Sequence, residues 1–229
     1  MRQFRKLLSY SLAALLAALL LYQGWFAAHI VWWIDHDPGP SSLMKQRAGE
    51  LRERKVPLRQ QWRNYRRISV HLKRAIVAAE DAKFLDHEGF DWAGIQHAME
   101  KNLKKGKVVA GGSTITQQLA KNLFLSGERS FLRKGQEAVL TAMIEALMGK
   151  RRILEIYLNV VEWGEGVFGA EAAARHYFGV GAESLSAEQA ARLAAMLPRP
   201  RYYDRNRNSG YLASYAQTIL ARMGAAQVP

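Results

Sequence analysis

The chain has 229 residues, and 33 lysines and arginines against 20 aspartates and glutamates give it a formal charge of +13 at neutral pH. It contains no cysteine, which excludes a disulfide scaffold and any cysteine-ligated zinc or iron–sulfur site. Because 49% of the residues are hydrophobic and six are tryptophan, a wholly disordered basic tail is excluded as well. We expect one folded domain, and a pI of about 10.1 indicates an anionic partner, whether nucleic acid, phospholipid or a phosphorylated substrate.

The N-terminal segment predicts a membrane anchor. Residues 7–34 include no Lys, Arg, Asp or Glu, and about 20 apolar residues are enough to cross a bilayer. Basic residues precede this segment and acidic residues follow it, which predicts a single pass with residues 1–6 in the cytoplasm and the remainder outside. These flanking residues are Arg2, Arg5 and Lys6, then Asp35 and Asp37. The alternative is a cleaved signal peptide with the shorter apolar core 12–21, which ends before the polar Gln23.

Beyond the anchor, the composition changes twice. Residues 35–68 carry two prolines, a glycine and two serines near their start and continue in a run rich in arginine and lysine, which predicts a juxtamembrane linker that leads into a basic helix or arm. Such a run is either a solvated face or a surface that attracts anionic lipid. In residues 69–229, apolar side chains recur every three or four positions, which predicts a mainly α domain. Two capping boxes are predicted, at Thr114 with Gln117 and at Ser186 with Gln189.

Glu80 lies on an apolar helical face. Four apolar residues share that predicted face, at positions i−8, i−4, i−3 and i+4: Leu72, Ile76, Val77 and Phe84. An ionised carboxylate is costly to bury unless it is paired or lines a cleft, and a desolvated one has a raised pKa that suits proton transfer. Glu80 is therefore a candidate catalytic residue, and the alternative is a structural ion pair with Arg74.

Glu137 is a second carboxylate at the edge of an apolar stripe, three residues before Leu140 and seven before Ile144. Two glutamates on separate helices can flank one cleft. Paired carboxylates across a cleft serve chemistry at the anomeric carbon of a sugar, where one handles a proton and the other steadies charge. The alternative is an ordinary helix ion pair with Arg133 at i−4.

Residues 111–121 predict a tight loop that opens into a helix. On that helix, a polar side is expected opposite a buried stripe: Thr114, Gln117, Gln118 and Lys121 against Ile115, Leu119 and Leu123. Together with the downstream cations Arg129, Arg133 and Lys134, the polar side can grip a pyrophosphate. The loop lacks the Gly-Lys-Ser/Thr ending of a P-loop, and the alternative is a solvated helix face. His87 has no second histidine at i+3 or i+4, which favours a structural hydrogen bond over a metal ligand.

These motifs, taken together and in order, resemble those of the peptidoglycan glycosyltransferases, the family shared by class A penicillin-binding proteins and monofunctional transglycosylases. The segments that carry the resemblance are Glu80–Asp91, Gly111–Gln118 with Lys121 and Asn122, Arg133–Glu137, Lys150–Asn159, Gly169–Gly179 and Leu185–Pro200. They cover about residues 70–205, and no motif position departs from the family pattern.

The resemblance implies a lysozyme-like helical domain, whose larger lobe holds the glutamates and whose smaller, mobile lobe lies near the membrane. It implies transfer of a growing glycan from its undecaprenyl-pyrophosphate carrier to the GlcNAc 4-hydroxyl of lipid II, with inversion from α to β. Glu80 would be the general base, and Glu137 would organise the cationic side or help to hold a divalent ion such as Mg²⁺ or Mn²⁺. The substrate-binding residues that it implies are Asp81, Phe84, His87, Ser113, Thr114, Gln117, Gln118, Lys121, Arg129, Arg133 and Lys134.

Because no further domain follows residue 229, the resemblance implies a monofunctional enzyme that polymerises glycan without cross-linking peptides. Its expected partners are lipid II, the growing glycan-pyrophosphate-undecaprenol, the inner (cytoplasmic) membrane, and cell-wall synthesis or division proteins, but not nucleic acid. Two rivals stay open. A lysozyme-like enzyme that cleaves peptidoglycan would share the glutamate but has no use for the cations, because its substrate carries no pyrophosphate. A basic membrane protein without enzymatic activity would need neither glutamate.

Overall fold

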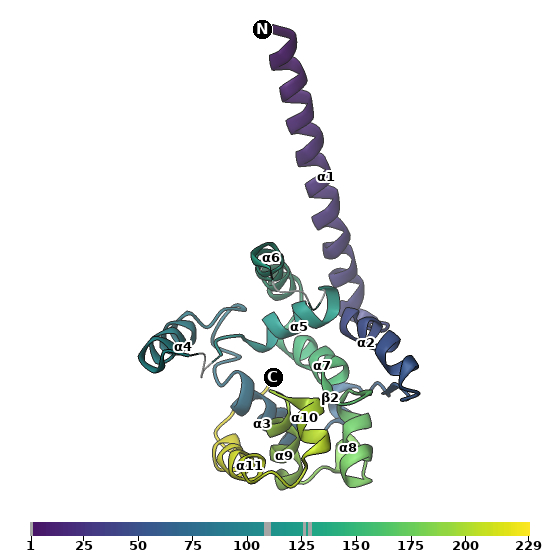
Figure 1. The fold of residues 1–229 in the computed structure, drawn as a ribbon, viewed down its shortest axis with the longest axis vertical. Helices are drawn as coiled ribbons and strands as arrows, with labels where there is room; N and C mark the ends of the chain where they lie inside the picture. Colours follow the sequence, from purple (N-terminus) through teal and green to yellow (C-terminus); the bar gives the residue numbers. More distant parts are fainter. Residues whose placement is uncertain (1, 108–110, 126, 128–129) are drawn as a thin grey trace. The chain divides into compact units, whose positions relative to one another are not determined.

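The computed structural model describes residues 2–107, 111–125, 127 and 130–229, and it divides into two units, Met1–Asp37 and Pro38–Pro229 (Figure 1). The first unit is a single helix, α1, Arg2–Asp35, of 34 residues. At 1.5 Å per residue it is about 50 Å long, which exceeds the roughly 30 Å hydrocarbon core of a bilayer. By length and composition, α1 can cross a membrane, as the sequence predicts, although a signal peptide would meet the same criteria.

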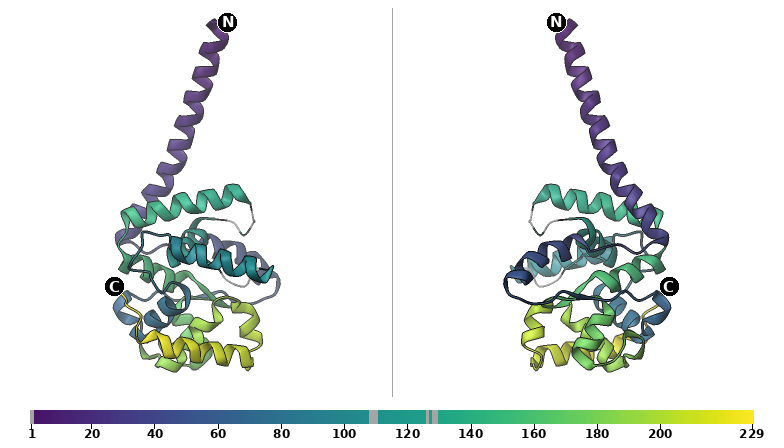
Figure 2. Two further views of the ribbon diagram at one scale, coloured as in Figure 1. Left: turned by 90° about the vertical axis from the view of Figure 1, so that its left-hand side faces the viewer. Right: turned by 90° about the vertical axis from the view of Figure 1, so that its right-hand side faces the viewer.

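The second unit is mainly helical, as predicted. Its elements are α2 (Ser42–Glu53), β1 (Arg59–Gln60), the short 3-10 helix η1 (Tyr65–Arg67), α3 (Val70–Glu80), α4 (Trp92–Lys105), α5 (Ile115–Phe124), α6 (Phe131–Leu147), α7 (Lys150–Val160), β2 (Glu162–Gly164), β3 (Val167–Phe168), α8 (Ala170–Phe178), the 3-10 helix η2 (Ala182–Ser184), α9 (Ala187–Met196), α10 (Pro200–Arg205) and α11 (Gly210–Met223). Figures 1 and 2 show α7 between two groups of helices. On one side α5 packs against α2 and α6, and on the other α3, α9 and α11 pack together.

The middle position of α7 explains its composition. A helix with one solvated face needs a single apolar stripe, but α7 has neighbours on several sides and buries seven of its 11 residues. Asn159 is buried completely, and its side-chain amide donates to the backbone oxygens of Arg63 and Glu155 while its carbonyl accepts from the Arg63 N–H at 2.8 Å. These hydrogen bonds satisfy a polar group that would otherwise be costly in the core.

The sequence did not predict the small sheet or the way in which residues 42–67 pack. The strand order is β1-β3-β2, with β1 parallel and β2 antiparallel to β3. Strands of two or three residues are too short to show an alternating pattern, which is why none was predicted. Of the two expected alternatives, a basic helix or an arm, residues 42–53 form a helix, α2, which β1 and η1 follow, and Gln46 of α2 donates to the Leu125 carbonyl oxygen at the end of α5.

Both predicted capping boxes are confirmed. Thr114 accepts from the Gln117 N–H while the Gln117 side chain accepts from the Thr114 N–H, and Ser186 and Gln189 do the same at the start of α9. α9 ends at Met196, two residues before Pro198. These local signals therefore fix the starts of α5 and α9.

Gly169, which joins β3 to α8, has a backbone that only glycine adopts readily. Its φ is 79° and its ψ is 156°, and an added Cβ would lie 2.6 Å from the carbonyl oxygen of Asn159. We expect Gly169→Ala to lower the free energy of unfolding by roughly 2–4 kcal/mol, from backbone strain plus the clash. Thermal unfolding of the full chain in detergent measures the loss. Gly49→Ala is the matched control, because an added Cβ there meets nothing within 4 Å in the interior of α2 and should leave stability unchanged or raised. Equal melting temperatures for the two variants would contradict this account.

Candidate active site

Glu80 is the last residue of α3, and it lies beside a buried apolar face. Leu72, Ile76 and Val77 are at most 1% exposed, as the sequence predicts. The prediction for Phe84 was wrong in one respect: α3 ends at Glu80, so Phe84 lies in the following turn rather than on the same helix, although it is fully buried. Glu80 therefore sits at the negative end of a helix dipole, which disfavours its ionised form.

The carboxylate of Glu80 is held by α5. Gln118 donates from Nε2 to Glu80 Oε2 at 2.7 Å. Both Glu80 and Arg74 belong to the described part of the chain, and no ion pair joins them there, so the structural ion pair weighed as an alternative is not what holds this carboxylate. The end of α3 and Gln118 of α5 are therefore in direct contact.

Burial raises the pKa of Glu80, whereas the hydrogen bond from Gln118 and the positive charge of Lys121 act in the opposite direction. The Lys121 side chain reaches solvent, yet the protein atoms around its ammonium displace enough water to lower the pKa of that group, and Glu137 opposes this shift. Both shifts favour neutral forms and bring the two groups closer to the pH range in which protons are exchanged.

Asp81, expected to bind substrate, instead anchors the start of α5. It is 7% exposed, and its Oδ2 accepts from the Ile115 N–H at 3.0 Å while its Oδ1 lies 2.9 Å from His87 Nε2. Because His87 Nδ1 accepts from the Gly89 N–H, the ring proton lies on Nε2 and is donated to Asp81. His87 is thus a structural hydrogen-bonder, as its isolated position in the sequence favours.

The polar side predicted for α5 divides in two. Thr114 and Gln117 are 2% and 5% exposed and close the capping box, and Thr114 Oγ1 also donates to the Gly89 carbonyl oxygen at 2.7 Å. The prediction that they share one solvated side with Gln118 and Lys121 was therefore wrong, because the first turn of a helix needs acceptors for its free N–H groups. Gln118 and Lys121 remain available to the cleft.

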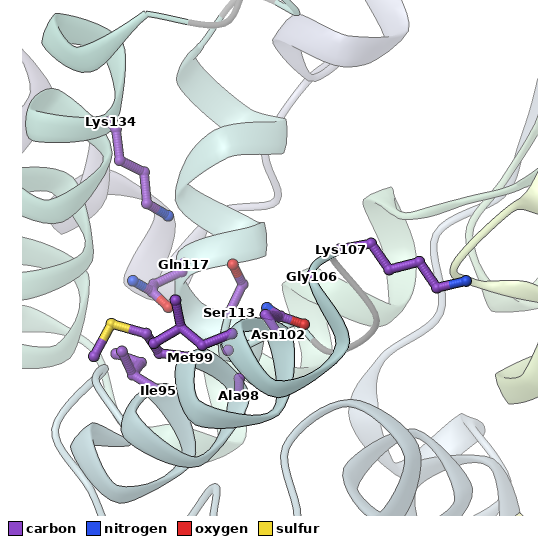
Figure 3. Close-up of a pocket in the computed structure, with 11 residues that line it drawn as sticks. Ile95, Ala98, Met99, Asn102, Gly106, Lys107, Ser113, Gln117 and Lys134 are labelled. Atoms are coloured by element: carbon purple, nitrogen blue, oxygen red, sulfur yellow. The ribbon is translucent and has the colours of Figure 1, made fainter.

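Two cavities lie beside α5. The first, of about 540 Å³, is lined by residues that include Gln118, Lys121 and Arg133, together with the polar Gln46 and Asn122. We call it the polar cleft. The second, of about 670 Å³, lies along α4 and is mainly apolar; Ser113, Gln117 and Lys134 supply most of its polar groups. Figure 3 shows the Lys134 ammonium extending toward Gln117, whereas Lys107 points away from the other lining side chains. The structure thus places Gln118, Lys121 and Arg133 in the polar cleft, joins Glu80 to that cleft through its hydrogen bond with Gln118, and places Ser113 and Lys134 at a different cavity. Arg129 lies outside the described residues.

Glu137 forms the ion pair with Arg133 that the sequence left open, and it also pairs with Lys134. Its Oε2 accepts from Arg133 at 2.8 Å, its Oε1 accepts from Lys134, and the residue is 3% exposed. Each oxygen thus faces a cation rather than an empty cleft. Among the described residues, no three His, Cys, Asp or Glu side chains gather as candidate metal ligands.

Sequence reasoning missed four buried or half-buried polar residues near the site. Lys150 donates to Glu145 at 2.8 Å and to the His87 carbonyl oxygen at 2.6 Å, and Thr116 donates to the same Glu145 oxygen. Tyr157 donates to Gln118 Oε1 at 3.0 Å. Lys150 and Tyr157 both lie in the motif Lys150–Asn159, but the spacing of Tyr157 in the sequence is that of one more residue in an apolar stripe.

If Asp81 anchors α5, its replacement should act on stability first. In Asp81→Asn, one of the two donors, from His87 or from the Ile115 backbone, would face an amide N–H, so we expect the free energy of unfolding to fall by about 1–3 kcal/mol. Thermal unfolding in detergent measures the change. Asp86→Asn alters an exposed acid of the same turn and should leave the melting temperature unchanged. Lost activity in Asp81→Asn with unchanged stability would instead support direct contact with substrate.

The chain is similar to known proteins along most of its length. Residues 47–224 match the family described as Transglycosylase. The chain is 57% identical to a protein of Janthinobacterium sp. (strain Marseille) over the whole of both chains, and 60% identical to one of Dechloromonas aromatica (strain RCB) over 95% of each. A protein of Methylobacillus flagellatus is 59% identical over 93% of this chain and 94% of its own. All three relatives carry the name biosynthetic peptidoglycan transglycosylase. This chain, matched along most of its length, belongs to the transglycosylase family.

Proposed function

We propose that this chain polymerises lipid II into β-1,4-linked glycan strands with release of undecaprenyl pyrophosphate. One observation carries the proposal: Glu80 Oε2 lies 2.7 Å from Gln118 Nε2, and Gln118, Lys121 and Arg133 line one polar cleft of about 540 Å³. Glu80 is not one of the described residues that line the cleft, but it is hydrogen-bonded to Gln118, which does line it, and its carboxylate feels the positive charge of Lys121. The names of the relatives support the same reaction.

The carboxylate suits removal of a proton from the acceptor. Glu80 removes hydrogen from the GlcNAc 4-hydroxyl as that oxygen attacks the anomeric carbon of the donor glycan. Burial raises the pKa of Glu80, and a base whose pKa approaches the working pH transfers protons efficiently. Because the attack comes from the face opposite the leaving pyrophosphate, the linkage changes from α to β.

The cations suit the departing pyrophosphate. Negative charge grows on the donor's phosphate oxygens as the sugar–oxygen bond breaks, and fixed positive charges lower the energy of that state. Lys121 and Arg133 both line the cleft, and Glu137 orients Arg133 through the contact at 2.8 Å. Glu137 therefore acts in this proposal by positioning a cation, and no step runs through a metal ion.

The N-terminal helix supports a membrane location for the reaction. Both substrates carry polyprenyl tails, so an enzyme anchored by α1 searches a surface rather than a volume. The basic residues before the helix and the acidic ones after it favour a cytoplasmic N-terminus and a catalytic unit outside the inner membrane. A protein partner from cell-wall synthesis or division stays a prediction.

The cations also argue against the peptidoglycan-cleaving alternative. A hydrolase or lyase needs a glutamate in a sugar cleft, but its substrate has no pyrophosphate to offset. Lys121 and Arg133 line this cleft, and a cleaving enzyme has no pyrophosphate whose charge they would offset.

The general-base role predicts a large loss of activity from a small change. In Glu80→Gln, the side-chain carbonyl can still accept from Gln118, but the basic oxygen is gone, so we expect kcat on lipid II to fall by about 10²–10⁴-fold. The melting temperature should be unchanged or higher, because a partly desolvated charge is removed. The assay follows glycan formation by the full chain in detergent, with finished peptidoglycan as a second substrate.

The matched control is Glu53→Gln, which alters an exposed glutamate at the end of α2 and should keep wild-type turnover. If the Glu80→Gln variant polymerises lipid II at the wild-type rate, Glu80 is not the general base. Soluble fragments from finished peptidoglycan, with no product from lipid II, would support the cleaving enzyme instead.

The donor role of Lys121 predicts a selective effect. Loss of one charged hydrogen bond to the pyrophosphate should lower kcat/KM by about tenfold or more in Lys121→Ala. With a preformed lipid-linked tetrasaccharide as donor, its KM should rise more than the KM of the acceptor lipid II. Lys104→Ala removes an exposed lysine of α4 and is the control. Equal effects on donor and acceptor would contradict the assignment.

A further inference from the structure

Tyr157 is connected to Glu80 through Gln118. The phenolic hydroxyl of Tyr157 donates to Gln118 Oε1 at 3.0 Å, and Gln118 Nε2 donates to Glu80 Oε2 at 2.7 Å. The three residues come from α7, α5 and α3, so the chain of hydrogen bonds crosses three helices. Tyr157 itself is fully buried and does not line the polar cleft.

The orientation of the Gln118 amide decides what it offers to Glu80, because one end of a glutamine amide donates hydrogen bonds and the other accepts them. With its NH₂ toward Glu80, Gln118 donates to the carboxylate; flipped, it would place a carbonyl oxygen against that carboxylate and repel it. A donor at the other end decides between the two orientations. Tyr157 supplies this donor, and in the flipped state its hydroxyl would face the NH₂ group and lose its acceptor.

The hydroxyl of Tyr157 remains a donor at every pH at which the protein works. Burial raises the pKa of this phenol well above its ordinary value, and the negative charges of Glu80 and Asp81 act in the same direction. Tyr157 therefore does not exchange a proton in the reaction, and its effect on Glu80 passes through the amide.

We propose that Tyr157 is a positioning residue for proton transfer: by donating to Gln118, it keeps the amide N–H of Gln118 directed at the Glu80 carboxylate. This inference rests on the proposed function, in which Glu80 is the general base. It goes beyond that function because it assigns the orientation of the base to a buried side chain that substrate does not reach.

The ionisation of Glu80 provides the readout. Among the groups that act on this carboxylate, Gln118 and Lys121 of α5 lower its pKa, whereas burial and the neighbouring Asp81 raise it. Tyr157 of α7 and Tyr215 of α11 are neutral phenols that feel its charge. Loss of the Gln118 donor therefore moves the pKa of Glu80 upward, and the acid limb of the kcat profile, where the base becomes protonated, moves to higher pH.

Tyr157→Phe tests this directly in the full chain with lipid II. We expect the acid limb to shift upward by about one pH unit, the size expected for a hydrogen bond to a charged group. Tyr177→Phe is the matched control: it removes the hydroxyl of a half-buried tyrosine, which donates to the Trp163 carbonyl oxygen at 2.8 Å, and should leave the acid limb in place. In a Gln118→Met background, Tyr157→Phe should produce no further shift, because the connection is already broken.

A second variant covers the case in which Tyr157→Phe fails to fold. Fluorotyrosine placed at position 157 keeps the hydroxyl and makes it a stronger donor, so the acid limb should move to lower pH. An unchanged acid limb in both variants, with stability lowered as in Tyr177→Phe, would show a purely structural role and overturn the inference. Failure of the wild-type chain to polymerise lipid II would instead overturn the proposed function, so the two failures are distinguishable.

Discussion

A carboxylate at the end of an apolar helix keeps a defined position only if a donor holds it, and in this chain the donor is Gln118 of α5. The contact of 2.7 Å between Gln118 and Glu80 joins α3, which ends at Glu80, to α5, which also carries Lys121. Burial and the helix dipole push this carboxylate toward its protonated form, while the amide and Lys121 favour its ionised form. The balance between these effects sets the ionisation that the proposed chemistry needs.

The remaining polar residues near the site mostly serve geometry. Asp81 and Thr114 satisfy the free N–H groups at the start of α5, and Glu137 sets the directions of two cations. Each of these groups is buried, so each is costly unless it is fully hydrogen-bonded. These three buried groups hold helices in place, whereas Gln118 and Lys121, which are more exposed, face the cleft.

The sequence predicts the helical class, both capping boxes and the apolar surroundings of Glu80, because each depends on residues close together in the chain. It could not predict which polar residues of α5 face the cleft. Helical spacing puts Gln117 and Gln118 almost side by side, and only the capping of Thr114 turns Gln117 inward. Tyr157 was missed for a similar reason: its spacing matches an apolar stripe, and its partner lies 39 residues away in the sequence. The short strands depend on pairing between distant segments, which periodicity does not record.

Glu80 and Asp81 are consecutive residues, and both hold α5: one contacts Gln118 and the other the Ile115 N–H at 3.0 Å. Two attachments, made one helical turn apart, remove the freedom of α5 to pivot about either one. The end of α3 and the start of α5 must therefore travel as a single rigid piece. Any widening of the polar cleft would then have to come from its other walls, such as α2 or the first turn of α6, while Glu80 and Lys121 keep their mutual spacing.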